Sequence, residues 1–94
     1  MAMSHAQGMA YELARELISS QIGHLSNDIA AASCRPVPDR EQISIMEAQI
    51  VRLGAEREHL NPEDDLSVRD VIRRYSLAPD LVMLLLDSVS PDER

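Results

Sequence analysis

The stretch Ile43–Leu60, ISIMEAQIVRLGAEREHL, decides the fold of this chain of 94 residues. Its seam positions recur at alternating intervals of three and four residues, and Arg57 takes one of them. The others are apolar: Ile43, Met46, Ile50, Leu53 and Leu60. This is the a/d pattern of a heptad repeat, which is typical of a helix that packs lengthwise against another helix. We therefore expect a helix over about 40–60 and a partner helix elsewhere in the chain.

A second apolar stripe precedes this stretch and predicts the partner helix. Between about residues 9 and 33, apolar side chains recur at the spacing of one helical face. Pro36 and Pro38 break the chain between the two stripes, and Asp39 precedes Gln42 at the spacing of an N-terminal cap. The sequence thus predicts a long antiparallel helical hairpin.

One register of this hairpin pairs apolar residues in successive layers. The predicted pairs are Ile29 with Ile43, Leu25 with Met46, Ile22 with Ile50, and Ile18 with Leu53. Two glycines fall inside the predicted helices, where each costs roughly 1 kcal/mol relative to alanine. Gly23 is either tolerated or marks the close approach of another backbone, and Gly54 leaves room for a larger residue opposite.

Two short helices are predicted after the hairpin, over about 67–75 and 79–88. Ser67 and Asp70 have the spacing of a capping box, and Pro79 suits the first position of the last helix. No segment has the alternating pattern of a strand. We therefore predict an all-α protein.

The domain organisation follows from the size of the chain. Residues 1–94 are predicted to form a single small helical domain, with disordered tails at 1–8 and 90–94. The chain contains no Phe and no Trp, so its core must consist of aliphatic side chains. A single core of this size is marginal, and oligomerisation is a common remedy. We therefore expect a dimeric helical bundle, formed through the hairpin faces or the last helix.

Charge and composition exclude several classes of partner and compartment. The formal net charge is -7 and no segment forms a basic stripe, which disfavours direct binding of nucleic acid. The longest apolar run, Leu81–Leu86, is far shorter than the ~20 residues needed to span a bilayer. Cys34 is alone, and the N-terminus lacks the pattern of a signal peptide. We expect a soluble cytoplasmic protein without contact to a membrane.

The residues of common catalytic and metal sites are scattered. His5, His24 and His59 cannot converge within one hairpin, so no metal site is predicted. Cys34 has no neighbouring base that would make it a nucleophile, and we interpret it as an incidental thiol rather than a catalytic one. The sequence predicts no cofactor and no enzymatic activity.

Two charged features are candidates for a binding surface. Arg57 at a seam position could specify a partner; alternatively, it reaches solvent at the open end of the hairpin or pairs with Glu12 or Glu16. The acidic cluster Glu63, Asp64 and Asp65 suits the start of a helix. It could instead be a recognition patch for a basic partner.

The last helix is the third candidate. Six successive apolar residues point all around a helix, so burial against the hairpin cannot hide all of them. Candidate partner-binding residues there are Leu81, Met83, Leu84 and Leu85.

No motif assigns the chain to a family, although its style is typical of small helical accessory proteins of bacteria and mobile elements. The first functional hypothesis is a non-enzymatic accessory or regulatory module that binds a partner protein and forms a homodimer. The alternative is an acidic inhibitor that occupies the basic nucleic-acid-binding groove of a partner, as anti-CRISPR and other anti-defence proteins do. Acids at one end of the hairpin and the cluster at 63–65 would then line the binding surface.

Overall fold

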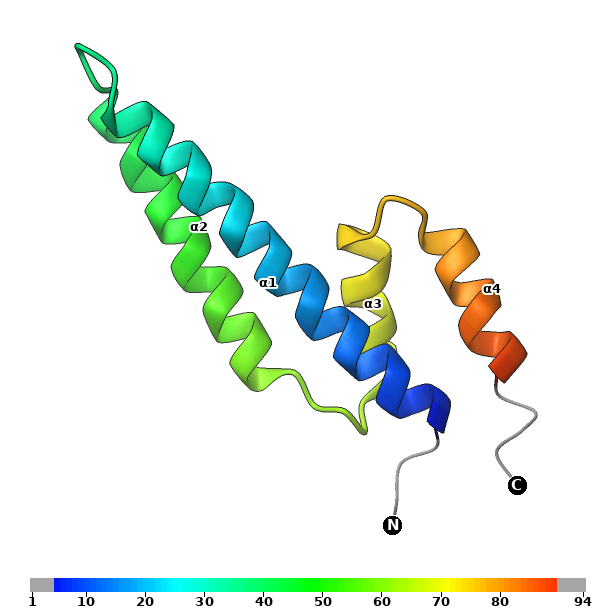
Figure 1. Cartoon of the computed structure of the whole chain (residues 1–94). Coiled ribbons are helices and arrows are strands. Elements are labelled where there is room, and N and C mark those ends of the chain that lie inside the picture. Colours follow the sequence, from blue (N-terminus) through cyan, green and yellow to red (C-terminus); the bar gives the residue numbers. More distant parts are fainter. Residues whose placement is uncertain (1–4, 90–94) are drawn as a thin grey trace. The chain divides into compact units, whose positions relative to one another are not determined.

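The computed structural model describes residues 5–89, with side chains up to residue 86, as four α-helices and no strand (Figure 1). The prediction of an all-α protein is confirmed. The chain divides into two compact units, one formed by residues 1–17 and 60–94 and the other by residues 18–59. That 1–94 acts as a single domain stays a prediction. The helices are α1 (His5–Ser33), α2 (Arg40–His59), α3 (Asp65–Tyr75) and α4 (Pro79–Val89).

α1 begins at His5, four residues before the predicted start at Met9. Ala6 is buried and continues, one turn earlier, the row of buried side chains that includes Ala10. This burial offsets the cost of roughly 1 kcal/mol that Gly8 brings to a helix interior. The apolar stripe is therefore one turn longer than the sequence pattern alone suggested.

The predicted disordered tails meet the structure only in part. The prediction of a tail over 1–8 is wrong for residues 5–8, which belong to α1. Residues 1–4 and 90–94 lie outside the described part of the chain. α4 ends at Val89, one residue beyond the predicted end.

The unit of residues 18–59 consists of the second part of α1, a short turn and α2, which run side by side (Figure 1). In the turn, the backbone N–H of Cys34 donates to carbonyls of the last turn of α1. At the start of α2, the N–H of Gln42 donates to Oδ1 of Asp39 at 3.1 Å, so the predicted cap is present. The buried side chains of this unit are Ile18, Ala32 and Met46.

No other chain segment packs closely against the two glycines within the helices of this unit. A Cβ atom added at Gly23 or at Gly54 would meet nothing within 4 Å. The close approach of another chain segment therefore does not explain either glycine. Both are simply tolerated, at a cost of roughly 1 kcal/mol each against alanine.

The other unit places α3 against α4. α3 buries one face completely, and Leu86 of α4 is also buried. α1 contributes small side chains, which allow helices to approach closely. The core of this unit contains Ala6, Ala10, Ala14, Leu60, Val68, Val71, Ile72 and Leu86.

α3 begins at Asp65, two residues before the predicted start, because Asp64 and not Ser67 is its N-cap. The carboxylate of Asp64 accepts hydrogen bonds from Ser67, which sits at the third helical position. The predicted capping box of Ser67 with Asp70 is therefore wrong. Asp70 instead forms an ion pair with Arg74, with 2.9 Å between Oδ2 and Nε.

A short turn connects α3 to α4. The N–H of Ser76 donates to the carbonyl of Ile72 at 2.9 Å and closes α3. The hydroxyl of Ser76 then accepts the N–H of Ala78 at 3.2 Å. α4 begins at Pro79, as the sequence predicts, since proline needs no N–H partner at a first helical position.

Candidate interaction surface

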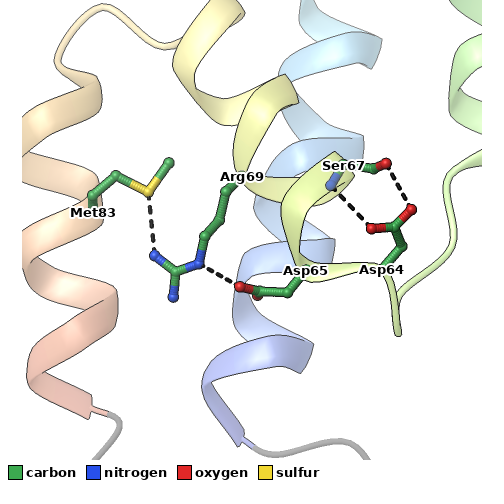
Figure 2. A network of polar contacts seen from close by, with 5 residues as sticks. All are labelled: Asp64, Asp65, Ser67, Arg69 and Met83. Carbon is green, nitrogen blue, oxygen red and sulfur yellow. Dashed lines mark hydrogen bonds and ion pairs between the residues drawn. The ribbon is translucent and has the colours of Figure 1, made fainter.

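The cap of α3 is built from one carboxylate and one serine (Figure 2). Oδ2 of Asp64 accepts the hydroxyl of Ser67 at 2.8 Å, and Oδ1 accepts the backbone N–H of Ser67 at 3.3 Å. Both hydrogen bonds hold the pKa of the Asp64 carboxyl below its ordinary value of 3.8, and the bond from the Ser67 hydroxyl contributes more than the bond from the backbone N–H. Asp64 is thus a structural residue of the α3 N-terminus.

The next acidic residue contributes to the junction of α3 with α4. Asp65 accepts Nε of Arg69 at 2.8 Å, and Nη1 of the same guanidinium lies 3.4 Å from the sulfur of Met83 (Figure 2). Arg69 therefore extends from α3 to α4. Met83 faces α3 and is half-buried, so it belongs to the inner side of α4.

Glu63 is the third member of the acidic cluster and is exposed. Its backbone N–H donates to Oδ1 of Asn61 at 2.9 Å, which shapes the turn before α3. The structure thus gives Asp64 and Asp65 contacts within the chain and leaves the Glu63 carboxylate at the surface. This arrangement agrees with the interpretation of the cluster as the start of a helix.

The outer side of α4 is apolar and exposed. Leu81, Leu84 and Leu85 are 56%, 63% and 58% exposed, whereas Leu86 on the opposite side is 5% exposed. Leu77, in the turn before α4, is fully exposed. At 100° per residue Leu81, Leu84 and Leu85 fall within one third of the helix circumference. We call Leu81, Leu84 and Leu85 the α4 strip.

Arg57 lies in the other unit and contacts α1. Its Nη1 donates to the hydroxyl oxygen of Ser19 at 2.9 Å. Within the described part of the chain, its Nε is buried and has no hydrogen-bond partner. Helical side chains lean toward the N-terminus of their own helix, which directs Arg57 toward the turn end of the unit. Arg57 thus joins α2 to α1 near Ser19.

The histidines and the cysteine do not gather into a site. Nδ1 of His59 donates to the carbonyl of Ala55 at 2.8 Å, and His24 lies 3.5 Å from the hydroxyl of Ser20. Cys34 is exposed in the turn before α2. Among the described residues, no three His, Cys, Asp or Glu side chains stand close enough to hold a metal ion.

Sequence reasoning found most of this surface but missed two residues. The spacing of Asp65 and Arg69, four residues apart, could have indicated their ion pair. The reach of Arg69 to Met83 could not be foreseen, because it depends on how α3 and α4 pack. Leu77 was assigned to a turn, and the structure shows that it is fully exposed there, before the start of α4.

None of the described helices is long and apolar enough to cross a membrane. The chain was also compared with known proteins. No model of a protein family matches the chain. Neither curated proteins nor solved structures match it.

Proposed function

We propose that this protein is a non-enzymatic, cytoplasmic protein-interaction module. It would act as an accessory or regulatory protein of a bacterium or a mobile element. The observation that supports this proposal is the α4 strip, in which three leucines of one short helix are each more than half exposed. A partner protein that covers the strip would remove this apolar surface from water.

The strip differs from scattered apolar residues on a protein surface. Single exposed leucines are common and need no explanation, whereas contiguous apolar patches mark interaction sites. Leu81, Leu84 and Leu85 are neighbours on one helical face, at the spacing that helix-in-groove and helix-to-helix contacts use. Docking on a partner is therefore the simplest role for the strip.

The remaining part of the proposal concerns the hairpin and the dimer. The register that pairs Ile18 with Leu53 and Ile22 with Ile50 places Ser19 slightly more than one helical turn from the residues facing Arg57, on the side of the interhelical turn. An arginine side chain can cover one turn of 5.4 Å. The hydrogen bond between Arg57 and Ser19 supports this register. Ile22, Ile50 and Leu53 are only half-buried, which favours a second hairpin against the same seam in a homodimer.

The acidic-inhibitor hypothesis receives less support. An inhibitor that mimics nucleic acid presents its carboxylates to a basic groove. Asp64 caps α3, Asp65 pairs with Arg69, and Asp70 pairs with Arg74, so these carboxylates already have partners within the chain. We therefore prefer the module that docks through its apolar strip.

Affinity capture from the native host tests the proposal. The tagged wild-type chain is compared with the double variant Leu81→Ser/Leu85→Ser and with the control Leu66→Ser. Leu66 is 82% exposed but lies on α3, outside the strip. We expect a protein that binds the wild type and the control and is lost with the double variant. A partner that the double variant retains would contradict the proposal.

Light scattering of the pure protein tests the dimer separately. We expect the mass of two chains at micromolar concentration for the wild type. A single-chain mass would contradict the homodimer without affecting the docking role of the strip. Circular dichroism of each variant checks that all chains remain helical.

A further inference from the structure

Arg57 interrupts the heptad seam of α2 at a position that controls how coiled-coil helices pair. Ile43 and Ile50 occupy the a positions before Arg57, and Met46 and Leu53 occupy the d positions. Isoleucine at a with leucine at d favours parallel pairs of identical helices. With an aliphatic residue at position 57, the α2 seam would therefore suit a second copy of α2 as well as α1.

α1 accommodates the guanidinium group through one hydrogen bond. Nη1 of Arg57 donates to the hydroxyl oxygen of Ser19 at 2.9 Å, and both residues are half-buried. Nε of Arg57 is buried and has no hydrogen-bond partner in the described part of the chain. A buried donor without a partner costs free energy, so an aliphatic side chain would fit this seam position at a lower cost. Stability alone therefore does not explain the arginine.

A parallel pair of α2 helices would accommodate the same group poorly. In such a pair equivalent a positions face each other, so the two Arg57 side chains would bring like charges together. Neither helix would offer the Ser19 hydroxyl. Glu56, at the rim of such a pair, offsets only part of this repulsion, because exposed ion pairs contribute little.

We infer that Arg57 reserves the α2 seam for α1 and prevents two α2 helices from pairing in parallel. This inference rests on the proposed register of the hairpin. The arginine selects the partner of the seam at a cost in stability, as single polar residues at a positions do. A homodimer of hairpins must then place its two Arg57 side chains at opposite ends.

The full-length variant Arg57→Ile tests both parts of the inference. Its urea midpoint should rise by roughly 0.5–1 M, since the variant removes the buried Nε without a partner. Cys34, exposed just before α2, reports the pairing. A parallel pair brings two Cys34 thiols together, whereas an antiparallel pair separates them by about the 30 Å length of α2. Under mild oxidation, we expect a fraction of disulfide-linked chains several-fold larger than in the wild type.

Two further variants serve as controls. Arg52→Ile removes an exposed arginine of α2 outside the seam and should change neither the midpoint nor the linked fraction. Ser19→Ala removes the acceptor of Arg57 and should lower the midpoint. A lower midpoint for Arg57→Ile, or a linked fraction equal to that of the wild type, would overturn the inference and leave the register intact. An unchanged midpoint for Ser19→Ala would contradict the hydrogen bond, and with it both the register and the inference.

Discussion

α3 and α4 have the same length of 11 residues and pack against each other, yet they differ in how many of their apolar side chains are buried. α3 buries Val68, Val71 and Ile72 on one face, leaves Leu66 exposed, and forms ion pairs between Asp65 and Arg69 and between Asp70 and Arg74. α4 hides one apolar face and exposes another. The comparison shows that α4 packs through one side, at Leu86, and leaves Leu81, Leu84 and Leu85 without a covering neighbour among the described residues.

The difference originates in the sequence of each helix. In α3, Val68, Val71 and Ile72 recur at helical spacing, so one partner surface covers every aliphatic residue of the helix except Leu66 near its start. In α4, the six successive apolar residues Leu81–Leu86 leave no polar face along that part of the helix. A helix of the second kind needs two neighbours, and the described chain provides one through α3.

The largest expected effect contrasts a buried residue of α3 with an exposed one of α4. Ile72 is fully buried, and Ile72→Ala should lower the free energy of unfolding by about 2–5 kcal/mol. Leu85→Ala should change it by less than about 0.5 kcal/mol, because Leu85 is 58% exposed. Urea unfolding of both variants measures the two values. Equal losses would mean that Leu85 is buried in solution, as it would be in a tight dimer.

The junction between the helices should give an intermediate effect. Arg69→Ala removes both the ion pair with Asp65 and the contact with the Met83 sulfur, and should cost roughly 0.5–1.5 kcal/mol. Arg69→Lys keeps the charge but loses the planar fork that reaches two partners at once, so it should recover only part of the loss. The same unfolding experiment measures both. Full recovery by lysine would show that the contact with Met83 contributes nothing.

The cap of α3 should give the smallest effect and a characteristic dependence on pH. The pKa of Asp64 is lowered in the folded chain, so the stabilisation from its carboxylate is complete above 3.8 and is lost as pH falls through the lowered pKa. Asp64→Asn should therefore unfold at a lower temperature than the wild type at neutral pH. The two melting temperatures should converge in acid. A difference that stays constant with pH would exclude the charged cap.

The sequence predicted the helices well because their signals are local. The stripe around Met46 and the cap at Asp39 depend on spacing alone, and both are present in the structure. The start of α3 was misplaced because two residue pairs, Asp64 with Ser67 and Ser67 with Asp70, have the same spacing. With Asp64 as the N-cap, the helix is longer and includes Asp65, which forms an ion pair with Arg69. The spacing of the two candidate pairs does not reveal this difference.

The candidate surface was harder to predict, because it depends on which side of α4 faces α3. The run from Leu81 to Leu86 is apolar throughout, so periodicity cannot say which residues are covered. The packing of α3 covers Met83 in part and leaves Leu81 and Leu85 exposed. Met83, which sequence reasoning grouped with the exposed leucines, is thus a contact of Arg69.

Site-specific crosslinking in the native host tests the docking role of the strip most directly. A photoreactive amino acid replaces Leu85 in one chain and Leu66 in another, and the adducts formed in living cells are identified by their mass. We predict an adduct with a partner protein from position 85 and none from position 66, although both side chains are exposed. No adduct at position 85, or the same adducts from both positions, would contradict the account.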